Sequence, residues 1–266
     1  MTLAVCVAGA TGRTGRPLAE RILEADDLTL WSAVSRSAAG ADLGTAWGGD
    51  PIGVPVHAFV ADALDGVDVL VDYTSPAVAR RHALTAIERG IAVVVGTSGL
   101  GSDDLAEIAT AARRRGVGVV AAEDFSLTGA LAQAAAALVA PFLPHREIID
   151  YGYADRRDAP SGCARELAER LGAISTPPVT VPAAPEKARG APIAGTRVHS
   201  VRLPSFLIST EVVFALPDER LVIRHDAVPS VTPYVSGTLL AVRAVPRLTG
   251  LIRGLDAVVL NRHDAG

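Results

Sequence analysis

The sequence predicts an α/β protein, with a doubly wound parallel sheet in its first half and a smaller α+β domain with a mixed sheet in its second half. Three observations lead to this prediction. Apolar runs alternate with helical segments over residues 1–126, a glycine-rich turn follows the first run, and strand patterns succeed one another between residues 198 and 226. We expect residues 1–126 to form the first domain and residues 127–233 the second.

The first strand and helix flank a glycine-rich turn. Residues 3–8 are apolar and partly β-branched, and residues 16–25 carry Leu18, Ile22 and Leu23 at helical spacing. The G-x-x-G-x-x-G spacing between them is a variant of the Rossmann-type dinucleotide fingerprint, in which glycines let the backbone approach a pyrophosphate. A turn with only a structural role is the alternative. The cofactor-binding residues predicted here are Gly9, Thr11, Gly12, Arg13, Thr14 and Gly15.

The second strand, residues 28–34, ends where ribose selectivity is normally set, and Ser35, Arg36 and Ser37 follow it. An acidic side chain there would accept hydrogen bonds from the ribose of NAD, and none is present. Arginine offers a planar fork of donors to a phosphate, and the serines add hydroxyls. These residues predict a preference for NADPH, with NADH possible; a solvated loop arginine is the alternative.

Further apolar runs at residues 67–71, 91–95 and 117–121 alternate with helical segments and are predicted to complete the parallel sheet.

In the second domain, a long alanine-rich helix is expected over residues 128–139, a strand over 148–153 and a helix from about Ser161. The first N–H groups of that last helix could bind a carboxylate or serve a capping turn. Residues 175–196 should form a long irregular excursion, such as a lid or a subunit contact. Strands are expected over residues 198–204, 207–214 and 220–226, and a last helix over 234–245.

Composition narrows the classes of function. Hydrophobic residues make up 49% and charged residues 20% of the 266 residues, and the formal net charge is -4. These values favour neither a nucleic-acid-binding surface nor a disordered tail, and no run is long enough to span a membrane. The two cysteines, Cys6 and Cys163, lack disulfide-type spacing, so the cytoplasm is the expected location. We expect a small-molecule partner and no metal.

Residues 72–76, 96–99 and 123–126 read D-Y-T-S-P, G-T-S-G and E-D-F-S, and residues 158–163 read D-A-P-S-G-C. In these motifs the whole chain resembles the 4-hydroxy-tetrahydrodipicolinate reductase family of bacterial lysine biosynthesis. The loops at the predicted strand ends are similar to the family's D-F-T-x-P, G-T-T-G and N-F-S segments, which surround the nicotinamide and its ribose. Residues 158–163 resemble its D-A-P-S-G-T loop, and later strands its H-S-V-R-L-P-G and I-R-H-D segments. The resemblance implies a homo-oligomer, tetrameric in the family, and a return of residues 234–266 to the first domain. It adds these residues to the predicted cofactor site: Tyr73, Thr74, Gly96, Thr97, Ser98, Glu123, Asp124 and Phe125.

The chain departs from the family where the substrate binds. The family motif E-x-H-H-x-x-K supplies a proton-donating histidine, a second histidine and a lysine, and the matching positions here are Gly152, Tyr153 and Arg156. Glycine has no side chain with a proton to donate, whereas a tyrosine hydroxyl has one, with a reference pKa of about 10. Tyr153 is therefore the candidate proton donor, with an aromatic packing role or donation by water as alternatives. Arg156 keeps the positive charge, and it is expected to bind a carboxylate together with Ser161, Gly162 and Cys163.

These observations favour an NADPH-dependent reductase acting on a small imine, enamine or related unsaturated carboxylate that differs from the family's substrate. Two other interpretations stay open. The chain could be the lysine-pathway reductase itself with an unusual site, or a nucleotide-binding protein without catalysis. The retained glycine turn and the D-A-P-S-G loop favour an enzyme, and the missing histidines favour a changed substrate.

Overall fold

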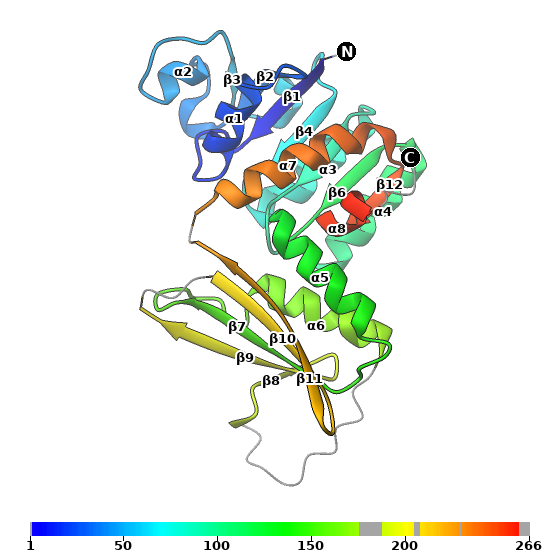
Figure 1. Ribbon diagram of the computed structural model, residues 1–266. Helices are drawn as coiled ribbons and strands as arrows, with labels where there is room; N and C mark the ends of the chain where they lie inside the picture. The colour runs from blue at the N-terminus through cyan, green and yellow to red at the C-terminus, as the bar shows by residue number, and fades with distance from the viewer. Residues whose placement is uncertain (1, 176–187, 205–207, 229, 261–266) are drawn as a thin grey trace. The chain divides into compact units, whose positions relative to one another are not determined.

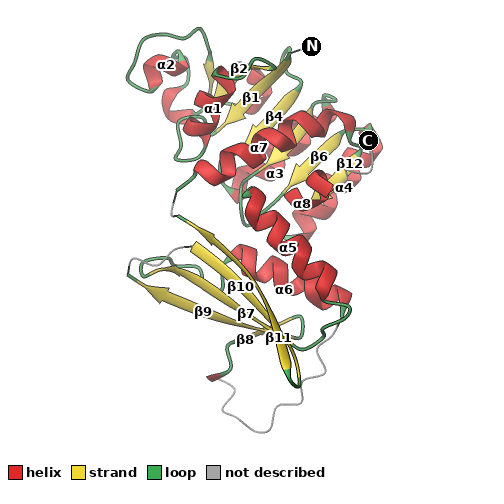
Figure 2. Cartoon of the chain, in the orientation of Figure 1, coloured by secondary structure: helices red, strands yellow, loops and turns green. Residues whose placement is uncertain are grey.

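A computed structural model describes residues 2–175, 188–204, 208–228 and 230–260 of the chain. It divides into two compact units, one of Met1–Leu127 with Val231–Gly266 and one of Thr128–Ser230. Most of the long excursion predicted over residues 175–196 lies outside the described residues, as do residues 205–207. Figure 1 labels the helices and strands, and Figure 2 separates them by type.

The first unit contains a seven-stranded parallel sheet in the order β12-β6-β5-β4-β1-β2-β3. This confirms the predicted doubly wound fold. The strand order reverses at β1, and in such sheets ligands bind outside the carboxyl ends of the strands at the reversal. The strands are β1 (Leu3–Ala8), β2 (Leu28–Val34), β3 (Val56–His57), β4 (Val69–Asp72), β5 (Ala92–Val95), β6 (Gly118–Ala121) and β12 (Gly250–Arg253).

Helices cover both faces of this sheet (Figure 2). Apolar side chains from α3, α4 and the strands form one buried cluster, which includes Leu70, Ile87, Val93 and Ile108. Strands β4, β5 and β6 are buried along their whole length, as expected of a parallel sheet with helices on both sides. The α-helices of the unit are α1 (Gly15–Leu23), α2 (Leu43–Ala46), α3 (Pro76–Glu88), α4 (Ser102–Arg115), α7 (Thr232–Ala244) and α8 (Leu255–Leu260).

The second unit is built on a mixed five-stranded sheet in the order β11-β10-β7-β9-β8, in which β7 and β9 run parallel and the other neighbours antiparallel. Helices α5 (Leu127–Val139) and α6 (Gly162–Ile174) lie on one face of it (Figure 1). Phe214, Ile148 and Leu171 belong to the core between them. The strands are β7 (Arg146–Tyr153), β8 (Ala191–Ile193), β9 (Thr196–Leu203), β10 (Ile208–Leu216) and β11 (Glu219–Ala227).

Strand β7 alternates between the two faces of this sheet. Arg146, Ile148, Asp150 and Gly152 are buried, whereas the residues between them are half-buried. Because successive side chains of a strand point to opposite faces, Asp150 and Gly152 belong to the face that carries α6, and Tyr153 belongs to the other face.

Candidate active site

The glycine turn after β1 is closely packed at its base and exposed at its tip. Gly9 has φ 86°, and a Cβ on it would lie 2.4 Å from the carbonyl oxygen of Tyr73. A Cβ on Gly15 would lie 2.1 Å from the carbonyl oxygen of Gly9. Thr11, Gly12 and Arg13 are exposed at the tip of the turn. Close packing thus demands two of the glycines, and the exposed tip at the start of α1 leaves room for a pyrophosphate.

Three hydroxyl groups lie in a row near the carboxyl end of β2. Thr11 Oγ1 lies 2.8 Å from Ser35 Oγ, which in turn lies 3.3 Å from Ser37 Oγ. Arg36 begins a short 3-10 helix there and is exposed. The structure therefore brings the glycine turn and the ribose-selecting segment together, and these residues fit the phosphorylated ribose of a dinucleotide.

Trp47 supports the glycine turn from a loop that the sequence patterns did not single out. Its indole N–H donates to the carbonyl oxygen of Ala10 at 3.1 Å, and the guanidinium of Arg16 lies over the ring, 5.4 Å from its centre. Asp42 orders this loop, because its carboxylate accepts hydrogen bonds from the backbone of Gly44, Thr45, Ile52, Gly53 and Val54.

Asp72 joins two loops of the predicted nicotinamide site. Its buried carboxylate accepts hydrogen bonds from the hydroxyl of Thr74 at 2.7 Å, the backbone N–H of Thr74 at 3.0 Å and the hydroxyl of Thr97 at 2.7 Å. Its second oxygen lies 2.7 Å from Nδ1 of His82 on α3. The loops after β4 and β5 are thus fixed through one acid.

Tyr73 is held from two sides. A Cβ on Gly96 would lie 2.3 Å from its ring, so the ring packs directly on that glycine. Its hydroxyl lies 2.7 Å from that of Thr238, and Tyr73 is the donor, because Thr238 gives its hydrogen to the carbonyl of Tyr234. Burial raises the pKa of Tyr73 above its usual value. The hydroxyl of Tyr73 therefore positions the ring and is unsuited to proton transfer.

The remaining residues of the predicted cofactor site lie in loops at the carboxyl ends of β5 and β6. Ser98 is exposed in the first of these loops, and Phe125 is buried with its ring against that of Tyr73. Glu123 accepts a hydrogen bond from the backbone of Gly99 at 3.1 Å, and Asp124 accepts one from that of Ser126 at 2.7 Å. Both acids thus have a role in holding their loops.

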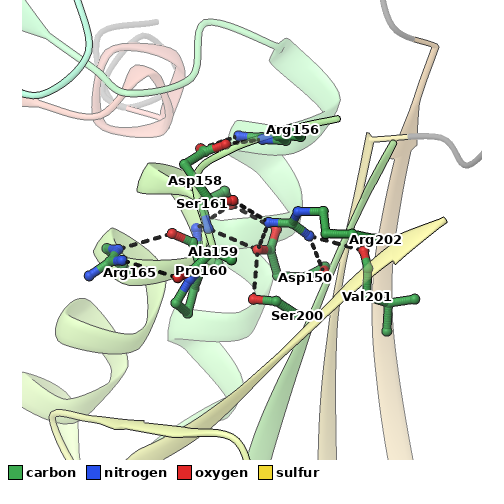
Figure 3. Close-up of polar contacts among 11 residues, drawn as sticks. Asp150, Arg156, Asp158, Ala159, Pro160, Ser161, Arg165, Ser200, Val201 and Arg202 are labelled. Carbon is green, nitrogen blue, oxygen red and sulfur yellow. Dashed lines mark hydrogen bonds and ion pairs between the residues drawn. The ribbon is translucent and has the colours of Figure 1, made fainter. Parts of the chain in front are cut away.

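In the second unit, Asp150 organises the D-A-P-S-G loop (Figure 3). Its buried carboxylate accepts hydrogen bonds from the backbone N–H and the hydroxyl of Ser161, both at 2.8 Å, and from Ser200 at 3.3 Å. Arg202 donates to it at 2.7 Å and also to the carbonyl of Asp158 at 2.6 Å. The loop and the first turn of α6 are therefore tied to strands β7 and β9.

The predicted substrate residues lie around this loop. Ser161 caps α6 by accepting from the N–H of Ala164, and Gly162 and Cys163 are the first residues of the helix. The backbone N–H of Ser161 donates to Asp150, and the predicted carboxylate-binding residues Gly162 and Cys163 follow it in the first turn of α6. Arg156 forms a bidentate ion pair with Asp158, at 2.6 and 2.8 Å (Figure 3). This pair lowers the pKa of Asp158.

The structure does not place Tyr153, the candidate proton donor, and Arg156, the predicted carboxylate ligand of the catalytic site, on one face. Arg156 lies in the segment that leads to α6, whereas Tyr153 lies on the sheet face opposite Asp150. Sequence reasoning missed Asp72, Asp150 and Arg202, all of which hold site loops. The signal available for the two acids was a carboxylate at the end or in the middle of a strand, where a buried charge requires partners.

Both halves of the chain match one protein family. Residues 3–125 match the family described as "Dihydrodipicolinate reductase, N-terminus", and residues 125–259 match "Dihydrodipicolinate reductase, C-terminus". The 4-hydroxy-tetrahydrodipicolinate reductase of Moorella thermoacetica is 37% identical over 260 residues, covering 96% of this chain and 97% of its own. That of Synechococcus elongatus is 39% identical over 272 residues, covering 96% and 98%.

Solved structures give the same result. The dipicolinate-bound dihydrodipicolinate reductase from Paenisporosarcina sp. TG-14 superposes with a TM-score of 0.81 at 25% identity, covering 97% of this chain and 99% of its own. An amine dehydrogenase from Mycobacterium smegmatis has a TM-score of 0.67 at 15% identity, with 94% of each chain covered, which shows a common fold alone.

In the described part of the chain, no helix is long and apolar enough to cross a membrane.

Proposed function

Because the chain belongs to the dihydrodipicolinate reductase family, we propose that it reduces a small imine- or enamine-type carboxylate that differs from the substrate of its relatives. As a member it is an NAD(P)H-dependent oxidoreductase with a Rossmann-type nucleotide-binding domain. The observation that carries the proposal is a retained D-A-P-S-G frame, anchored by Asp150, in which positions 152, 153 and 156 are glycine, tyrosine and arginine.

NADPH is the proposed cofactor. When bound, it supplies a hydride to the electron-poor carbon of the substrate. The amides of the glycine turn would hold the pyrophosphate, and Arg36 with Ser35 and Ser37 would hold the ribose phosphate. Tyr73, Thr74 and Thr97 would position the nicotinamide end, since Asp72 fixes their loops. The cytoplasm, with its pool of reduced cofactor, is the proposed location.

The amides of Gly162 and Cys163 at the start of α6, with Arg156 beside them, are proposed to bind the substrate carboxylate. Arg156 is only 18% exposed, and its partner Asp158 is 49% exposed. A substrate carboxylate can therefore replace Asp158, which returns to water as the substrate binds.

The proton donor is proposed to be water, with Tyr153 kept as a prediction to be tested. The position of Tyr153, opposite Asp150 and the D-A-P-S-G loop, favours a packing role. Protonation of a nitrogen after hydride transfer does not require a dedicated acid. If Tyr153→Phe keeps its kcat on the identified substrate, water is the donor, whereas a fall of roughly 100-fold or more makes Tyr153 the general acid.

A second candidate is the lysine-pathway reductase itself, which the 37% and 39% identity over nearly the whole chain favours. The two are separated by following NADPH oxidation with freshly generated 4-hydroxy-tetrahydrodipicolinate. We expect turnover far below that of the Moorella thermoacetica enzyme measured in parallel. Turnover equal to that enzyme's would overturn the proposal of a changed substrate.

We also propose a homo-oligomer formed through the sheet face of the second unit that lies opposite α5 and α6. This face carries a groove of about 750 Å³, whose lining includes Ile149, Tyr151, Val201 and Val213. Apolar sheet faces of this kind commonly pack on a second copy. The tetramer implied by the family resemblance is the expected state.

A further inference from the structure

Gly152 lies where two arginine side chains converge on the backbone of β7. Its Cα pairs with that of Arg202 across the parallel β7 and β9 strands. A Cβ built on Gly152 would lie 3.1 Å from Cδ of Arg156, 3.3 Å from Nε of Arg202 and 3.4 Å from Cδ of Arg202. The arginine stems thus pack directly against the strand at the point where the family carries its proton-donating histidine.

The two arginines differ in how firmly they are held. Arg202 is 13% exposed, and its terminal nitrogens donate to the carboxylate and the carbonyl of Asp150 and to the carbonyls of Val201 and Asp158. Its Nε is buried and has no partner among the described residues. Arg202 is therefore a fixed part of the framework and cannot move aside without breaking these bonds.

Arg156 is the arginine that has an exchangeable partner. Its guanidinium pairs with Asp158, a half-exposed carboxylate two residues along the chain. Since Arg202 is fixed, a Cβ at position 152 requires the stem of Arg156 to give way by a few tenths of an ångström. The position of the guanidinium that meets a substrate anion is therefore set by the absence of a side chain at Gly152.

We propose that Gly152 is a positioning residue for substrate binding, which lets the stem of Arg156 lie against β7 and so presents its guanidinium to a substrate carboxylate. The inference rests on the proposed function and deepens it: position 152 serves carboxylate recognition here and contributes no proton. Glycine at 152 and arginine at 156 then form a coupled pair that replaces the family's histidine and lysine.

The test is a double-mutant cycle with dipicolinate as the probe, titrated by calorimetry into protein saturated with NADPH. The variants are Gly152→Ala, Arg156→Ala and the combination of both. A shifted Arg156 stem weakens a charge-assisted contact without removing it, so Gly152→Ala should weaken dipicolinate binding by roughly 3- to 10-fold. In the Arg156→Ala background the same change should have an effect of less than about 2-fold, because the displaced stem is absent.

Two controls separate a local effect from a folding defect. Gly49→Ala places a Cβ 3.7 Å from its nearest neighbour, which is an ordinary contact, and should bind dipicolinate as the wild type does. NADPH affinity should be the same in the variants at positions 152 and 156, since the glycine turn lies in the other unit.

An unchanged dipicolinate affinity in Gly152→Ala, or an equal loss in both backgrounds, overturns the positioning role. Wild-type protein that binds NADPH but not dipicolinate also overturns it and leaves the cofactor assignment standing. Wild-type protein that binds neither contradicts the proposed function itself.

Discussion

Arg36 is exposed at the start of the short helix after β2, next to the hydroxyls of Ser35 and Ser37. If Arg36 binds the ribose phosphate, Arg36→Ala should raise the KM for NADPH by roughly 10- to 100-fold. This range corresponds to the loss of one charge-assisted contact, which contributes about 1.5–3 kcal/mol. The KM for NADH should change by less than about 2-fold, because NADH lacks the phosphate. Steady-state kinetics with both cofactors measures this, and an equal loss for the two would contradict the assignment.

Asp150 is the buried acid on which the substrate loop depends. Its side chain is 2% exposed and its partner Arg202 13% exposed, so Asp150→Ala leaves a buried charge without its counter-ion. We expect a loss of about 3–5 kcal/mol in the free energy of unfolding, measured in urea. Asp226→Ala breaks the exposed pair with Arg224 and should cost less than about 1 kcal/mol. Similar losses in the two variants would show that the Asp150 pair is no stronger than a surface pair.

At the scale of elements, Asp72 links the carboxyl ends of β4 and β5 with α3. Asp72→Asn keeps the size of the side chain but puts an amide N–H where one of the carboxylate oxygens now accepts. The loops of Thr74 and Thr97 should loosen, raising the Kd for NADPH by roughly 10-fold while the affinity for dipicolinate is kept. His82→Gln should have a smaller effect, because it disturbs one bond. Calorimetry on both variants gives the comparison, and an unchanged NADPH affinity in Asp72→Asn would rule out the linking role.

The loop of residues 42–54 provides a pH test. Backbone N–H groups, above all that of Ile52, lower the pKa of Asp42. The stability that Asp42 contributes is thus fully present above its unfolded pKa of about 3.9 and is lost as the pH falls through the lower folded pKa. The stability difference between wild type and Asp42→Asn should be constant above about pH 5 and shrink below about pH 4. Urea unfolding at each pH measures it; a difference that grows on acidification would reverse the sign.

The predicted elements agree best with the structure where the local pattern is strong. Strands predicted at residues 3–8 and 28–34 have those bounds in the structure, because each is an apolar run ended by a glycine turn or a serine. The short strand β12 and the helix α2 were not predicted, since four residues carry too little periodicity to stand out. The edge position of β12 depends on pairing with β6, which is distant in sequence.

At the scale of the whole molecule, assembly is the main prediction. Val213 lines the groove on the open face of the second sheet, so Val213→Glu would bury a charge in the proposed interface. We expect the proposed tetramer to dissociate, measured by light scattering after size exclusion. Phe59→Glu, at a residue 65% exposed in the first unit, introduces the same charge and should leave the assembly intact. A tetrameric Val213→Glu variant would exclude this face as the interface.

The placement of the candidate cofactor residues at strand ends was predictable from the sequence, because their spacing from the apolar runs is local. In the substrate half, the D-A-P-S-G loop was predictable from the sequence, but the hydrogen-bond network around Asp150 was not. Asp150 is 11 residues from Ser161 and 52 residues from Arg202 along the chain, although it forms hydrogen bonds with both. No local sequence pattern links these residues.

The amino-acid sequence by itself determined the periodicity, the turns and the family, since these depend on residues close together in the chain. The tertiary structure alone decided which buried charges are paired and on which face of β7 each side chain lies. The packing of the Arg156 and Arg202 stems against Gly152 is likewise a feature of the tertiary structure. The physical reason is that hydrogen bonds and steric contacts depend on distance in space, which strand order and register set.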